Sequence, residues 1–81
     1  MAYIVMAPMY KTMTSGKVDK YTVRKGDKVK KGMSVAEIVA EGYFTLLSEV
    51  DGVIMEFYVE EGEYVEVGTP LIEIKEALRD V

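Results

Sequence analysis

The 81-residue chain contains neither cysteine nor histidine. Without cysteine it can form no disulfide and no thiolate metal site. Without histidine it lacks the commonest transition-metal ligand and the usual general base near neutral pH. Composition therefore excludes a zinc centre and a Ser-His-Asp triad, and we predict no metal site.

The chain has fewer basic residues (10) than acidic residues (14) and has no long apolar run. The formal net charge is −4, which argues against nucleic-acid binding, because a basic surface supplies much of that affinity. No apolar run approaches the ~20 residues of a membrane-spanning helix, and residues 1–9 lack the basic start of a signal peptide. We therefore expect a cytoplasmic protein, one domain over residues 1–81, with no nucleic-acid and no membrane partner.

The centre of the chain, residues 35–48, has the pattern of a β-hairpin: two strand-like apolar runs separated by Ala-Glu-Gly. A three-residue loop with Gly42 in the left-handed conformation would close it, because glycine takes positive φ without steric cost. This register places Ile38 opposite Phe44 and Ala36 opposite Leu46. Phe44 is then predicted to face the core, while Tyr43 covers the hairpin edge or contacts a partner.

The rest of the chain reads as two copies of one pattern. Shifting the sequence by 36 residues superimposes residues 16–38 on residues 52–74 without a gap, with seven identical pairs among 23. Six of the seven glycines pair in this way, and Gly42 has no mate. Each copy predicts a long strand, a very short strand and a third strand, separated by glycine turns. These strands are predicted at 17–24, 28–30 and 34–40, and again at 53–60, 64–66 and 70–75. Short, evenly spaced strands in two similar halves indicate an all-β sandwich or barrel with a pseudo-two-fold axis.

Two stretches, GKVDKYTVRKGDKVKKGMSVAEI and VDGVIMEFYVEEGEYVEVGTPLIEI, resemble the biotinyl/lipoyl carrier domain. The resemblance extends from about residue 3 to residue 75. It implies a flattened β-barrel of two four-stranded antiparallel sheets with pseudo-two-fold symmetry. In that family a hairpin between the halves presents a lysine, to which a ligase attaches lipoate or biotin as a swinging arm. The implied partners are that ligase and the other proteins of a multienzyme complex.

The chain departs from the family pattern at the hairpin tip. Lipoyl domains have acid-Lys-Ala and biotinyl domains have Met-Lys-Met, whereas this chain has Glu41-Gly42-Tyr43. Alignment from the first strand puts Gly42 at the lysine position, and alignment from the second strand puts Glu41 there. No lysine or arginine occurs between Gly32 and Ile74. Because amide attachment needs a primary amine, we expect no lipoate or biotin on this chain.

The resemblance implies a lipoyl-type carrier domain of a 2-oxo acid dehydrogenase-like or related acyl-transfer system, without the arm. The acid at Glu41 and the absence of Met-Lys-Met favour the lipoyl type. The alternatives are a biotinyl-type carrier and a cofactor-free binding or assembly module built on the same barrel. We expect no enzymatic activity, since Glu60, Glu61 and Glu63 form a predicted turn without a cleft. Met6, Met9 and Met13 are predicted to fill one end of the barrel.

Overall fold

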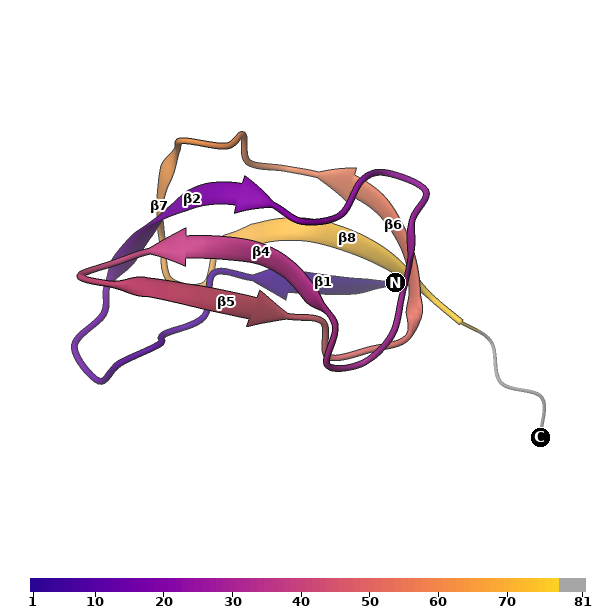
Figure 1. Ribbon diagram of the computed structural model, residues 1–81, viewed down its shortest axis with the longest axis horizontal. Helices are drawn as coiled ribbons and strands as arrows, with labels where there is room; N and C mark the ends of the chain where they lie inside the picture. Colours follow the sequence, from indigo (N-terminus) through magenta and orange to yellow (C-terminus); the bar gives the residue numbers. More distant parts are fainter. Residues whose placement is uncertain (78–81) are drawn as a thin grey trace.

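The computed structural model describes residues 1–77 and is all-β (Figure 1). Its eight strands form two four-stranded antiparallel sheets with the orders β1-β8-β6-β3 and β5-β4-β2-β7. The strands are β1 (Ala2–Val5), β2 (Ser15–Tyr21), β3 (Lys28–Val29), β4 (Ser34–Val39), β5 (Tyr43–Leu47), β6 (Gly52–Phe57), β7 (Tyr64–Glu66) and β8 (Pro70–Glu76). The predicted all-β architecture of two four-stranded sheets is confirmed.

The two sheets have equivalent topologies. Matching each strand with the strand four places away along the chain converts the order β1-β8-β6-β3 into β5-β4-β2-β7. Each sheet thus has one long central pair, β8 with β6 and β4 with β2, and each has one very short edge strand. This correspondence is the predicted pseudo-two-fold symmetry.

The core lies between the sheets and is built from the inward side of each strand. In β4, the side chains of Val35, Ala36 and Ile38 are fully buried, and in β8 the same holds for Leu71, Ile72 and Ile74. The adjacent buried pairs Val35–Ala36 and Leu71–Ile72 interrupt the two-residue alternation of a strand, because the pairing register shifts at Val35 and at Leu71. Met6 and Met13 are also buried, so the prediction that these methionines fill the barrel is confirmed for them, and Met9 packs against the core.

Glycine turns end the long strands earlier than predicted. The strands expected at 17–24 and 53–60 are Ser15–Tyr21 and Gly52–Phe57. The chain bends after each strand to enter a turn in which Gly26 (φ 89°) and Gly62 (φ 93°) adopt the left-handed region. Val23 and Val59 nevertheless point into the core and are only 6% exposed. Their apolar character therefore indicates that they are buried, and it does not indicate that they lie in a strand.

Tyr21 lies at the end of β2 and contacts the segment that leads into the second of these turns. Its ring lies 4.3 Å from that of Phe57, and its hydroxyl donates to the Val59 carbonyl. Burial, together with the nearby Glu61 and Glu63 carboxylates, raises the pKa of Tyr21 from 10.0 to about 12. The folded state therefore retains a proton that the unfolded chain releases.

We expect this stabilisation to be complete below about pH 10 and to be lost as the pH rises through the folded-state pKa of about 12. Urea denaturation between about pH 8 and about pH 11 measures the decline in the free energy of unfolding. The decline should be shallower in Tyr21→Phe, which cannot ionise. An identical decline in both proteins would show that Tyr21 does not cause it.

No helix among residues 1–77 is long and apolar enough to cross a bilayer.

Candidate functional site

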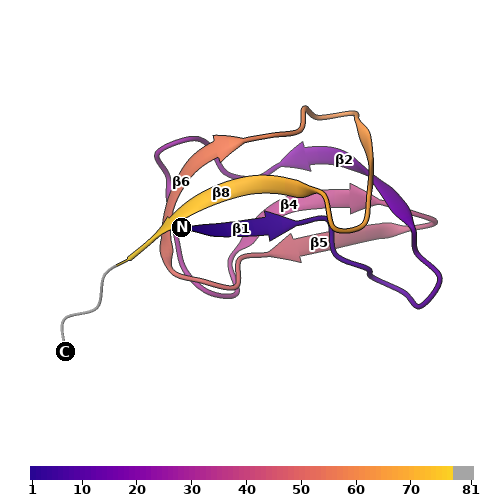
Figure 2. The same cartoon turned by 180° about the vertical axis from the view of Figure 1, so that it is seen from behind.

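The β4–β5 hairpin projects at one end of the sandwich, away from the N-terminus and the end of β8 (Figures 1 and 2). Its register places Ile38 opposite Phe44 and Ala36 opposite Leu46, as predicted. Phe44 packs against the core, and its ring centroid lies 6.0 Å from that of Tyr10. The hairpin is thus held from inside by the core and from the side by the loop before β2.

The loop that closes the hairpin differs from the prediction. Val39 lies opposite Tyr43, which leaves three loop residues, and the Ala40 N–H donates to the Gly42 carbonyl at 2.9 Å. Glu41, the middle residue, takes the positive φ of 60°, and Gly42 does not lie in the left-handed region. The assignment of that conformation to Gly42 was wrong. The chain reverses at the residue farthest from both strands, and in this register that residue is Glu41.

The corrected loop predicts opposite responses at two neighbouring residues. A non-glycine residue in the left-handed region is strained by about 1–2 kcal/mol, so Glu41→Gly should raise the free energy of unfolding by about 1 kcal/mol. Gly42→Ala should change it by less than about 0.5 kcal/mol, because the added Cβ would lie 3.8 Å from the Phe44 ring. Urea denaturation of both variants tests the loop. A loss of about 1 kcal/mol in Gly42→Ala would indicate that Gly42, rather than Glu41, is the left-handed residue of the loop.

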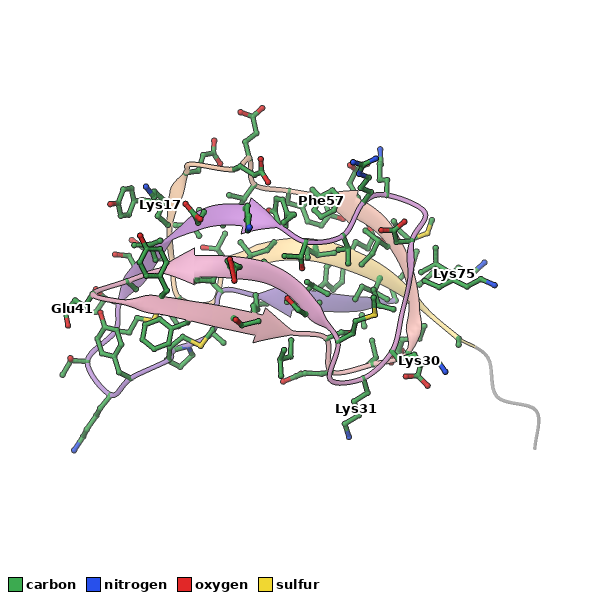
Figure 3. The ribbon with its side chains drawn as sticks, in the orientation of Figure 1. Lys17, Lys30, Lys31, Glu41, Phe57 and Lys75 are labelled. Carbon is green, nitrogen blue, oxygen red and sulfur yellow. The ribbon has the colours of Figure 1, made fainter. Side chains whose placement is uncertain are left out.

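The tip presents a carboxylate and a phenol, and no amine. Glu41 lies at the apex and is exposed (Figure 3), Tyr43 is 81% exposed, and Gly42 is half-buried. Lys17 lies on β2, opposite Val39 on the neighbouring β4. The three predicted tip residues, Glu41, Gly42 and Tyr43, all lie at the end of the hairpin. None of them has an amine that could form an amide with a carboxylic acid cofactor.

The remaining lysines labelled in Figure 3 lie far from the tip. Lys30, Lys31 and Lys75 project at the opposite end of the sandwich (Figure 3). Lys11 is exposed in the Tyr10–Met13 turn, in which the Met13 N–H donates to the Tyr10 carbonyl. The sequence patterns did not identify the support that Tyr10 gives to Phe44. The available signal was an aromatic residue next to Met9 in a stretch that otherwise lacks strand character.

The acidic turn before β7 has a structural role. The Glu61 carboxylate accepts the backbone N–H of Tyr21 at 2.9 Å, and the Glu63 carboxylate accepts the N–H of Glu60 at 3.3 Å. These contacts satisfy backbone donors around the turn, and all three glutamates are exposed. Within residues 1–77 no group of three or more acidic side chains is arranged to hold a metal ion.

Comparisons with known proteins agree with this geometry. A protein-family model described as "Biotin-requiring enzyme" matches residues 4–74. The solution structure of the lipoyl domain of the 2-oxoglutarate dehydrogenase complex from Azotobacter vinelandii is similar, with 28% sequence identity and a TM-score of 0.72. The match covers 93% of this chain and 98% of that domain. No curated protein sequence matches the chain.

Proposed function

The chain belongs to the biotinyl/lipoyl carrier-domain family, and we propose that it is a lipoyl-type carrier domain that lacks its arm. Members of this family are non-catalytic carriers that hold lipoate or biotin covalently, and lipoyl domains associate with multienzyme complexes. The proposed setting is a 2-oxo acid dehydrogenase-like or related acyl-transfer system.

Two features support the lipoyl type over the biotinyl type. The similar solved structure is a lipoyl domain of the 2-oxoglutarate dehydrogenase complex, matched over 93% of this chain. The Met-Lys-Met sequence of biotinyl domains is also absent from the tip.

The absence of an amine at the hairpin apex is the observation that carries the proposal. Lipoate and biotin are carboxylic acids, and the family attaches them by an amide to a lysine amine. Glu41 supplies a carboxylate at the apex, and Gly42 supplies no side chain. The residues present do not fit either cofactor, so we propose that the hairpin stays unmodified and acts through its surface.

The exposed aromatic ring at the tip favours a docking role as the second candidate function. Tyr43 is 81% exposed at the start of β5, whereas the next residue, Phe44, packs against the core. Exposed tyrosines are common anchors of protein interfaces, because a large ring is buried on binding with little loss of conformational entropy. Under this proposal the barrel is a cofactor-free binding or assembly module.

The mass of the protein made in cells tests the proposal. The chain is produced in cells supplied with lipoate and biotin, next to a lipoyl domain that has its attachment lysine. We expect the control domain to acquire the cofactor mass and this chain to retain its unmodified mass of 9.1 kDa. A cofactor adduct on this chain, located by peptide mapping, would contradict the proposal.

A further inference from the structure

Two equivalent segments of the two halves carry opposite charges. Residues 24–31 include β3 and hold five basic residues and one acid, whereas residues 60–67 include β7 and hold four acids and no base. Their backbones correspond, since Gly26 and Gly62 have φ angles of 89° and 93° and each segment leads into the short edge strand of its sheet. The 36-residue repeat aligns Arg24 with Glu60, Lys25 with Glu61 and Lys30 with Glu66. The fold therefore accepts either sign of charge here and does not require the basic residues.

Three lysines surround Val53 on the outer face of the sheet that contains β3, β6 and β8. Lys28 and Lys75 lie directly opposite Val53 on the two neighbouring strands, and residues directly opposite each other share one face of a sheet. Lys28 and Lys30 also line a shallow hollow with Val53 and Ala77. Lys30 and Lys75 project at the same end of the sandwich (Figure 3), and all three lysines are exposed. We refer to Lys28, Lys30, Val53 and Lys75 as the basic patch.

The basic patch also has acidic neighbours. Asp51 lines the same hollow, and Glu49 and Glu76 line the adjacent one. The Asp51 carboxylate accepts the backbone N–H of Lys31 at 2.8 Å. Within residues 1–77, no carboxylate forms an ion pair with a lysine of the basic patch. Since adjacent strands lie about 4.8 Å apart, the Cα atoms of the two lysines that flank Val53 are about 10 Å apart, and the repulsion between these lysines at low ionic strength is not offset by an ion pair.

We propose that the basic patch is the docking site for an acidic segment of a partner protein, in which acidic side chains flank an apolar one. The carboxylates of this segment lie against Lys28, Lys30 and Lys75, and its apolar side chain covers Val53, which is half-buried. Such a segment removes the repulsion among the three ammonium groups and buries apolar surface at the same time. The patch lies at the end of the sandwich opposite the hairpin tip (Figure 3), so this docking role is separate from any role of Tyr43.

Charge and chemistry favour a protein segment over other anions. The chain as a whole has a formal net charge of −4, which repels a long polyanion such as nucleic acid, whereas a short segment contacts the basic patch alone. A small free anion leaves the apolar lining of the hollow, including Val53, in contact with water. A second copy of this chain is disfavoured by the like net charges of the two molecules. The occupant that fits is therefore a segment of a different protein.

Titration with a labelled acidic peptide tests the proposal. The probe is an octapeptide of alternating glutamate and valine, and we expect fluorescence anisotropy to give a Kd of about 100 µM or tighter at an ionic strength of about 20 mM. At about 150 mM salt the Kd should rise by about fivefold or more, because salt screens exposed charge pairs. Lys30→Glu should also raise the Kd by about fivefold or more. Lys11→Glu is the matched control at an exposed lysine of the Tyr10–Met13 turn, and it should change the Kd by less than about twofold.

Acetylation of the lysine amines locates the site independently. The bound peptide should slow the acetylation of Lys28, Lys30 and Lys75 and leave that of Lys11 unchanged, as measured by peptide mapping. The absence of binding overturns the proposal, as do equal effects of Lys30→Glu and Lys11→Glu, or equally tight binding of a peptide in which glutamine replaces glutamate. An octamer of deoxythymidine that binds as tightly as the acidic peptide also overturns it, because the patch then selects charge alone. If Lys30→Glu does not fold, Lys28→Gln at another exposed lysine of the patch replaces it.

Discussion

Gly52→Ala is expected to lower the free energy of unfolding by about 3 kcal/mol, the largest stability effect that we predict. A Cβ at Gly52 would lie 2.3 Å from the Lys75 carbonyl oxygen and 2.7 Å from Ile74 Cγ2. The closest atom belongs to the backbone of β8, which is paired on its other side with β1. The clash can therefore be relieved only by moving strands. Since a domain of this size has a total stability of roughly 4–12 kcal/mol, this variant should be close to unfolding.

The matched control is Gly16→Ala, at the equivalent position of the first half. There the added Cβ would meet Met13 Cε at 3.0 Å, Ile38 Cγ2 at 3.1 Å and Met6 Sδ at 3.3 Å. These are side-chain atoms, and methionines adapt readily, so a loss of about 1 kcal/mol or less is expected. Urea denaturation of the two variants measures the difference. Equal losses would contradict the expectation that a Cβ at Gly52, which meets the β8 backbone, costs more stability than a Cβ at Gly16.

The sequence predicted the architecture because glycine spacing and apolar pattern agreed with each other. The turns at Gly26, Gly32, Gly62 and Gly68 all have φ between 89° and 96°, a region that side-chain-bearing residues rarely adopt. The apolar pattern also predicted the hairpin register correctly, since pairing Ile38 with Phe44 places apolar residues on the same buried face. Local and tertiary preferences coincide at these positions, and sequence patterns are informative where they do.

The sequence could not predict the details of the hairpin tip or the ends of the long strands. Gly42 was expected to take the positive φ because glycine does so most easily, but the register places Glu41 at the point of reversal. Val23 and Val59 were assigned to strands because they are β-branched and apolar, yet they lie in turns that pack into the core. In both cases the tertiary arrangement overrides local propensity.

Glu41→Lys is expected to convert the chain from a protein that a lipoate ligase leaves unmodified into one that it acylates. The substitution places a primary amine at the middle residue of the hairpin loop, on a position that is already exposed. The backbone should be unchanged, because lysine and glutamate have similar conformational preferences at a φ of 60°. The effect is all-or-none, since no other residue of the loop has an amine.

Gly42→Lys is the comparison variant, because one alignment of the family pattern puts the attachment position there. Gly42 is half-buried and follows the point of reversal, so a lysine at this residue is less well presented than one at Glu41. We expect slower acylation of Gly42→Lys than of Glu41→Lys. The reverse order would identify Gly42 as the position that the ligase recognises.

Intact-mass measurement after incubation with lipoate ligase, lipoate and ATP tests the central claim most directly. The wild-type chain, Glu41→Lys and Gly42→Lys are treated in parallel. The proposal predicts that the wild-type mass does not change, although lysines such as Lys11 and Lys17 are present, and that Glu41→Lys gains one lipoyl group. A lipoyl group on the wild-type chain would contradict the claim that this carrier domain is not lipoylated because its hairpin apex has no amine.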